Sequence, residues 1–276
     1  MSRLLLTATL TASLTGCIVV TGPTETASDT IVVEDPVEAL GFDLGAGDLT
    51  VRVGDVEQIE VHRTFEWRGE APDALIALDG TTLVLDVDCA RGLTSWCAVD
   101  HEVLVPHGLD VSGITGAGDV YLYGTAFAVD VETGAGDVEI TDAGDVTVLT
   151  GAGDVRLTGV AGALVAETGA GDLHGTDLTG PGGLIDTGAG DVDLAWAAPP
   201  VDLTIGTGAG DVLLVLPAGT YAFDVETGFG DLDMQGLSSD PLAEGRVSVS
   251  TGAGSVTLRG VDLPPTEGGQ TEPATE

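Results

Sequence analysis

Lysine is absent from this chain of 276 residues, and its eight basic residues are all arginine. Aspartate and glutamate together number 45, so the formal net charge at pH 7 is −37. Nucleic acids and anionic membrane surfaces bind through clustered lysine and arginine, so the composition argues against both as partners. The lack of lysine also excludes a phosphate-loop lysine and a lysine Schiff base. A solvated, self-repelling surface explains the acidity, and adaptation to high salt is a second explanation.

Catalytic residue types are also scarce. The sequence has four histidines, which are not clustered, and no Gly-x-Ser-x-Gly motif. Aromatic residues make up 4% of the chain, so no stripe for stacking sugars is evident. We therefore do not expect an enzyme. A polysaccharide-degrading β-helix that uses its abundant carboxylates is the least favoured alternative, because the basic residues of such enzymes are missing.

The first 17 residues have the features of a targeting segment. Arg3 supplies a positive charge, and residues 4–14 form an apolar run that is too short to span a bilayer. The next residues, Leu14-Thr15-Gly16-Cys17, resemble the lipobox of bacterial lipoproteins. The resemblance implies a signal peptide over 1–16, cleavage before Cys17 and attachment of lipid to its thiol. An ordinary secretory signal is the alternative. Residues 17–37 then read as a tether, and the Pro-rich acidic residues 261–276 as a disordered tail.

Two cysteines remain after Cys17, and they lie close together in the sequence. Cys89 and Cys97 are separated by a short segment that contains Gly92. Outside the cytoplasm such a pair favours a disulfide that closes a hairpin loop. A metal site would need further ligands, and only Asp88 and His101 are near. We predict the disulfide.

One short phrase, Thr-Gly-Ala-Gly-Asp followed by Val or Leu, recurs along the chain. Its copies follow one another at steps of about 17 to 24 residues, with Phe229 replacing alanine in one copy and Ser255 replacing aspartate in the last. Such a period is typical of one supersecondary unit stacked on copies of itself. The aspartates of the phrase are Asp119, Asp137, Asp154, Asp172, Asp191, Asp211 and Asp231.

Short strands with apolar residues at alternate positions follow each phrase, and no segment shows a helical apolar stripe. Valine and leucine in the interior, with glycine at the corners, predict an all-β protein with a β-solenoid over residues 112–260. Residues 38–111 alternate in the same way without the close repeat. Because Gly45-Ala46-Gly47-Asp48 is an early copy of the phrase, we expect a first coil followed by a hairpin-rich insertion that caps the stack.

A family resemblance rests on two features in sequence. A Val105-Pro106-His107-Gly108 step leads into the repeated Gly-x-Gly-Asp turns. This arrangement resembles a bacterial family of β-strand-repeat proteins labelled putative adhesins, which is related to the head domains of some autotransporter adhesins. The resemblance covers most of residues 40–260 and implies a right-handed parallel β-helix. It implies no catalytic residues.

The repeated aspartates admit two interpretations. If the coils stack in register, the carboxylates form a ladder whose neighbours, about 4.8 Å apart, repel by roughly 0.9 kcal/mol in bulk water and by more near a protein surface. Calcium bound between carboxylates and turn carbonyls would offset this repulsion and would make the chain a β-roll-like binding module. Hydrogen bonds from turn amides to the carboxylates, with screening by salt, are the favoured alternative. We therefore expect no cofactor and keep calcium as the rival.

The sequence thus predicts a lipid-anchored β-solenoid outside the cytoplasm with a structural or adhesive role. Its partners would be the membrane, through Cys17, and a protein or glycan surface of unknown identity. An outer membrane or a cell surface is the expected location. The adhesive part of this prediction depends on the family resemblance alone.

Overall fold

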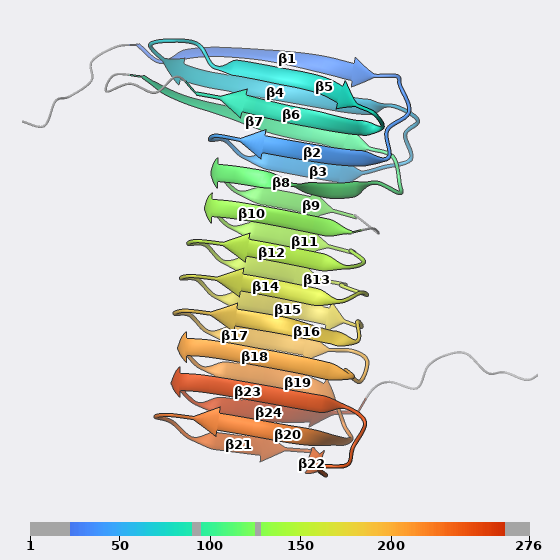
Figure 1. Ribbon diagram of the computed structural model, residues 1–276, viewed down its shortest axis with the longest axis vertical. Helices are drawn as coiled ribbons and strands as arrows, with labels where there is room; N and C mark the ends of the chain where they lie inside the picture. The colour runs from blue at the N-terminus through green and yellow to red at the C-terminus, as the bar shows by residue number, and fades with distance from the viewer. Residues whose placement is uncertain (1–22, 90–94, 125–127, 263–276) are drawn as a thin grey trace, which may run out of the picture.

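The chain forms an elongated stack of β-strands (Figure 1). The computed structural model describes residues 23–89, 95–124 and 128–262. Over these ranges the strands form two sheets of 12 strands each, and the predicted all-β, solenoid-like fold is confirmed. No helix in these ranges is long and apolar enough to cross a membrane. Cys17 and the predicted signal peptide 1–16 lie outside the described residues.

The first sheet, sheet A, is antiparallel at its N-terminal end and parallel elsewhere. Its strands, in spatial order, are β1 (Glu25–Val33), β4 (Ile59–Arg68), β7 (Trp96–Val105), β3 (Leu49–Val53), β9 (Val120–Tyr123), β11 (Val138–Thr141), β13 (Val155–Thr158), β15 (Leu173–Leu178), β17 (Val192–Trp196), β19 (Val212–Pro217), β24 (Val256–Val261) and β21 (Leu232–Gln235).

The second sheet, sheet B, lies opposite sheet A and is likewise parallel except at its N-terminal end. From the C-terminal end of the stack, its strands are β22 (Ser238–Ser239), β20 (Thr220–Thr227), β23 (Arg246–Ala253), β18 (Asp202–Ala209), β16 (Gly182–Thr187), β14 (Leu164–Thr168), β12 (Val146–Thr150), β10 (Val129–Ala135), β8 (Asp110–Ala117), β2 (Ala39–Leu44), β6 (Thr82–Asp88) and β5 (Asp73–Asp79).

A coil consists of one strand from each sheet, and equivalent residues of successive coils lie side by side. In sheet A, for example, Val138 pairs with Val155 and Ile140 pairs with Leu157. Alternate residues of a strand point to opposite faces of a sheet, so the valine and leucine at every second position all point inward. These side chains form a hydrophobic core that runs from Leu40 to Leu258. Burial of each contributes about 1.5–3 kcal/mol, so the alternation itself drives the stacking.

Further strands continue both sheets beyond the first coil at the N-terminal end, and the outermost of them pair antiparallel. The coil β2–β3 stacks on β8 and β9, and β4 to β7 are inserted in the chain between β3 and β8. β7 pairs with β3 and β6 pairs with β2, while β4, β1 and β5 lie further out (Figure 1). The inserted strands therefore cover the end of the hydrophobic core.

Residues 25–33 differ from the prediction of a tether over 17–37. They form β1, which pairs antiparallel with β4 over nine residues, from Glu25 opposite Trp67 to Val33 opposite Ile59. Most side chains of β1 are exposed, so the segment shows no apolar alternation that would distinguish it from a linker. Main-chain pairing with β4 and a side-chain contact of Asp29 hold it in the sheet.

A buried arginine connects the two sheets within this cap. Arg63 of β4 is 7% exposed and donates to both carboxylate oxygens of Asp29 in β1, at 2.9 and 2.6 Å. It also donates to the carbonyl oxygen of Ala74 in β5, at 2.9 Å. The guanidinium group holds the pKa of Asp29 below its ordinary value. A planar group with several donors suits this position, because it satisfies acceptors from both sheets at once.

The last two coils do not follow the order of the sequence. β23 lies between β18 and β20, and β24 lies between β19 and β21. The chain therefore forms the outermost coil, β20–β21, before it returns to fill the place beside β18 and β19. A ladder in sequence order would place Asp231 beside Asp211, whereas the structure places Ser255 between them. The long segment between the last two phrases provides the connection that this crossover needs.

Candidate functional site: the stacked corner ladder

The repeated phrase forms the corner at which each coil passes from sheet B to sheet A. The threonine lies at the end of a sheet B strand, and the residue after the aspartate begins the next sheet A strand. At these corners the Oδ1 atom of one aspartate accepts a hydrogen bond from the backbone N–H of the equivalent residue in the next coil. The N–H of Asp154 donates to Asp137 at 2.8 Å, and that of Asp172 donates to Asp154 at 2.9 Å.

The ladder is longer than the predicted set of seven aspartates. At the N-terminal end, the N–H of Asp119 donates to Asp48, and that of Asp48 donates to Asp100, both at 2.9 Å. At the other end, the N–H of Ser255 donates to Asp211 at 2.7 Å, and that of Asp231 meets the Ser255 hydroxyl at 3.4 Å. The remaining steps connect Asp119 to Asp137, Asp172 to Asp191 and Asp191 to Asp211.

These bonds show what the carboxylates do. A charged acceptor forms a stronger hydrogen bond with an N–H than a neutral acceptor does, and here each bond also connects two coils. The amide partner belongs to the neighbouring coil, whereas the sequence interpretation assumed an amide of the aspartate's own turn. The aspartate side chain therefore acts as an additional rung between coils at a corner where the strands are interrupted.

Other polar side chains bind the second carboxylate oxygens along part of the ladder. Arg156 lies 2.9 Å from Asp154 Oδ2 and 3.6 Å from Asp137 Oδ2. The Tyr121 hydroxyl donates to Asp119 Oδ2 at 2.9 Å, and burial together with this bond raises the pKa of Tyr121 to about 12. These contacts reduce the repulsion between neighbouring carboxylates. Sequence reasoning missed them, although both residues lie two positions after an aspartate and so on the same side of the strand.

The threonines of the phrase form a second ladder inside the corner. Most are buried, and their hydroxyls donate to the carbonyl oxygen of the second glycine in the preceding coil, as from Thr168 to Gly153 at 3.1 Å and from Thr187 to Gly171 at 3.1 Å. Thr115 is the exception, because its buried hydroxyl has no hydrogen-bond partner. Gly47 of the preceding coil has φ of 116°, against 153° at Gly153, so its backbone is turned differently.

Thr168 and Thr115 therefore form a matched pair for mutation. We expect Thr168→Val to lower the free energy of unfolding by about 1 kcal/mol, because the Gly153 carbonyl loses its donor. Thr115→Val should leave stability unchanged or raise it, because it removes a hydroxyl that is buried without a partner. Urea unfolding monitored by circular dichroism measures both. Equal losses in the two variants would show that the hydroxyl bonds contribute nothing measurable.

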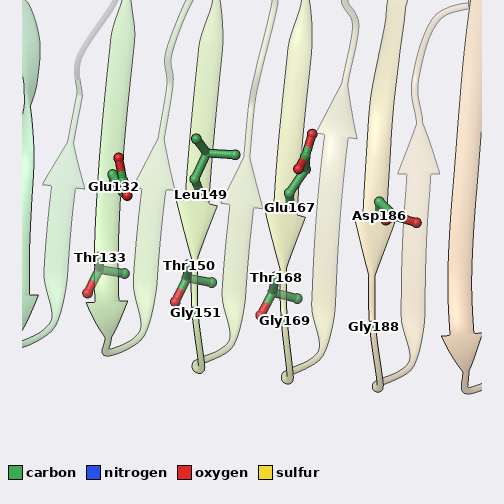
Figure 2. A pocket seen from close by; sticks show the side chains of 10 residues that line it. All are labelled: Glu132, Thr133, Leu149, Thr150, Gly151, Glu167, Thr168, Gly169, Asp186 and Gly188. Carbon is green, nitrogen blue, oxygen red and sulfur yellow. The ribbon is translucent and has the colours of Figure 1, made fainter.

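A shallow groove follows the outer side of the threonine row on sheet B (Figure 2). Acidic side chains from three strands line it, namely Glu132, Glu167 and Asp186, with Leu149 between the first two. Glu167 and Asp186 are direct neighbours on β14 and β16. The lining includes no aromatic, basic or histidine side chain that could hold a sugar or transfer a proton beside them. The groove therefore does not resemble the active site of a polysaccharide-degrading β-helix.

Calcium binding remains the rival explanation of the aspartate ladder. Among the described residues, no group of three or more His, Cys, Asp or Glu side chains is placed to hold a metal ion. One oxygen of most ladder carboxylates already accepts a main-chain hydrogen bond. We expect that adding calcium to millimolar concentration to protein treated with chelator leaves the melting temperature unchanged within about 1 °C. Magnesium at the same concentration controls for ionic strength, and a rise specific to calcium would favour the β-roll interpretation.

Cys89 and Cys97 lie where the cap passes from sheet B to sheet A. Cys89 follows β6 and Cys97 belongs to β7, and the structure joins them by a disulfide with Cα atoms 5.7 Å apart. This position lets the bond hold together the two sheets of the cap.

Removing this bond should destabilise the protein. We expect the double variant Cys89→Ser/Cys97→Ser to lose about 2.5 kcal/mol, as for closure of a short loop. Urea unfolding of the variant should coincide with unfolding of the wild type in dithiothreitol, which serves as the control. Two thiols that react with iodoacetamide in native, unreduced protein would contradict the pairing.

Two parallel sheets, joined by stacked glycine corners, define this chain as a β-solenoid. Its residues 37–259 match the family model described as Toastrack DUF4097, and the chain belongs to that family. No curated protein matches the chain.

Solved structures with similar folds come from bacteria. One, described as a putative adhesin from Parabacteroides distasonis, has a TM-score of 0.55 and 11% identity, and the match covers 84% of this chain and 97% of the other. A second, described as a putative adhesin from Bacteroides fragilis, has a TM-score of 0.44 and 14% identity, with 86% and 97% of the two chains covered. At 11% identity, the likeness to the Parabacteroides distasonis protein shows the fold alone.

Proposed function

We propose that this chain is a right-handed, lipid-anchored β-solenoid outside the cytoplasm, with a structural or adhesive role and no catalytic activity. Membership of the Toastrack family and the fold shared with a protein described as a putative adhesin support surface contact. The observation that carries the proposal is that the repeated polar residues form hydrogen bonds between coils. Ladder aspartates bind the amides of the next coil, and threonines bind the glycine carbonyls of the preceding one. The side chains that recur most often thus hold the rod together.

The lipid anchor is proposed from the sequence at Cys17. A rod attached at one end and strongly negative along its length would hold its far end away from the membrane surface. Its partner would then be a protein or glycan surface outside the cell. Nucleic acid is not proposed as a partner, because the chain lacks the cationic clusters that bind phosphate.

Labelling in cells tests the anchor and the surface role together. With an alkyne fatty acid as the label, the wild type should become labelled and should enter the membrane fraction. Cys17→Ala should lose both properties, and the double variant Cys89→Ser/Cys97→Ser should retain the label as the matched control. Adhesion of cells to protein-coated and glycan-coated surfaces should fall with Cys17→Ala. Unchanged adhesion on every surface would contradict the adhesive role, and unlabelled wild type would contradict the anchor.

A further inference from the structure

The two ends of the stack differ in how the core is closed. At the C-terminal end, β21 is the last strand of sheet A, and β22 covers only Thr220 and Tyr221 of β20 in sheet B (Figure 1). Leu232 and Met234 of β21 are 49% and 40% exposed, whereas their partners in the next coil, Val256 and Leu258, are fully buried. Apolar side chains that the pattern directs inward therefore lie open at this end.

The edge of β20 also presents main-chain groups that inner coils use for stacking. Phe223 of β20 occupies the position that Val129 occupies in β10, as the strand pairing from coil to coil shows. In inner coils the N–H at this position donates to the following coil, as from Val129 to Asp145 and from Val146 to Ala163, both at 2.9 Å. No described strand follows the segment 222–227, so its N–H and C=O groups face outward on alternate residues.

The side chains along this edge specify the chemistry of a strand that could pair with it. Phe223 and Val225 are partly buried and point toward the core, while Asp224 and Glu226 are exposed on the outer face. Asp233 on β21 is exposed as well. Cross-strand neighbours of opposite charge are favourable, and like charges are not. A strand that places apolar residues inward and lysine or arginine outward fits both faces.

Charge argues against the two nearest alternatives. A second copy of this chain that met the same edge would set Asp224 and Glu226 against acidic residues of the same kind, in a molecule whose formal net charge is −37. The sequence after residue 262 contains three glutamates, two adjacent glycines and three prolines, and has no basic residue. Proline and glycine are poor strand formers, and the glutamates would face the acidic edge.

We propose that the C-terminal coil is a docking site for an extended polypeptide segment with alternating apolar and basic residues, bound by strand addition along 222–227 of β20. The main-chain ladder supplies affinity, and the inward and outward side chains supply selectivity. Leu232 and Met234 form the opposite, apolar wall of the site. Strand addition here is independent of the proposed surface role, because it is measured on purified protein without cells or lipid.

Binding of designed peptides tests this site. The probe is a fluorescent heptapeptide that alternates valine and lysine, titrated with the chain from residue 18 to 276 in about 50 mM salt and followed by anisotropy. We expect saturable one-to-one binding, at least about tenfold tighter than for a peptide that alternates valine and glutamate. A peptide with the same valines and lysines in two blocks controls for attraction by net charge alone. Equal binding of the alternating and block peptides would overturn the proposal.

Two variants distinguish peptide binding at the edge of β20 from attraction by the overall charge of the protein. Val225→Pro removes an N–H that points out of the sheet and leaves the charge unchanged, so it should weaken binding at least about tenfold with an unaltered circular dichroism spectrum. Asp224→Lys/Glu226→Lys should reverse the preference toward the valine–glutamate peptide, and this test does not depend on a proline. Undiminished binding by both variants would contradict the proposal. The proposal would also be contradicted if the peptide bound only after deletion of residues 263–276. It would likewise be contradicted if the peptide never bound and sedimentation showed a dimer that Val225→Pro abolishes.

Discussion

Replacing Gly171 by alanine should lower the free energy of unfolding by about 4 kcal/mol. A Cβ atom at this position would overlap the backbone carbonyl of Gly153 in the preceding coil, and φ at Gly171 is 155°, a conformation that residues with side chains rarely adopt. Backbone strain and overpacking are each worth about 1–3 kcal/mol. The backbone of one coil must shift away from the next, so the loss should also disturb the aspartate bond beside it.

The preceding residue provides the control for this prediction. Ala170 occupies the same corner but is exposed, and the equivalent Phe229 shows that even a large side chain fits there, since it is 82% exposed. Ala170→Ser should change stability by less than about 0.5 kcal/mol. Urea unfolding of both variants gives the comparison. If Gly171→Ala were as stable as Ala170→Ser, the coils would not approach each other as closely as the structure shows.

Acidification should destabilise the protein through one buried histidine. His101 of β7 is 1% exposed, and its Nδ1 lies 3.1 Å from the carbonyl oxygen of Val99. Burial lowers the pKa of His101 to about 4, and the positive charge of the nearby Arg63 lowers it as well. The hydrogen bond with Val99 and the negative charge of Asp100 raise this pKa but do not offset the burial. The unfolded chain takes up a proton at about pH 6.5 and the folded chain does not. Stability is therefore complete above about pH 6.5 and falls as the pH drops to about 4, by about 3 kcal/mol.

Substitution by leucine isolates this contribution. The residue in register with His101 on the adjacent strand β3 is Leu49, and the next strand, β9, has Val120 in the same position, while Arg63 of β4 lies on the other side. Leucine should therefore be accommodated at His101, because the neighbours toward the solenoid are apolar. The variant should lose most of the dependence on pH between about 6.5 and 4. The Asp29 carboxylate, whose pKa is lowered by Arg63, still loses its charge in more acidic solution and leaves a residual slope. Unfolding in urea at several pH values measures both curves. Identical slopes in wild type and His101→Leu would show that another group governs the acid response.

Local repetition made most of the stack predictable from sequence. The phrase specifies a corner, and the apolar alternation after it specifies which residues face inward, as at Val138 and Ile140. The early copy at Asp48 correctly indicated a first coil before the insertion. No sequence signal marked Asp100 as part of the ladder, because it lies in a strand without the phrase. Its place follows from the pairing of β7 with β3.

The order of the last coils and the role of β1 could not be read in the same way. Every phrase offers the same stacking surface. The residues around Thr227 and Thr251 are nearly the same, so either threonine could stack beside Thr207. The structure pairs Thr207 with Thr251. The place of β1 depends on its partner strand β4, because the role of Asp29 is to bind the Arg63 side chain that is buried beside it. Sequence patterns show which residues are buried. The order of the last coils and the place of β1 depend instead on which distant segments pair.

Cross-linking at the corners measures the in-register stacking most directly. Ala209 and Ala253 are register partners in β18 and β23, and both are exposed. Cysteines on neighbouring strands in register are close enough for a disulfide. We predict that Ala209→Cys/Ala253→Cys forms an internal disulfide under mild oxidation, and that Ala209→Cys/Phe229→Cys, two strands apart, does not. Cross-linking of the second pair but not the first would show that the coils stack in sequence order and would contradict the structure.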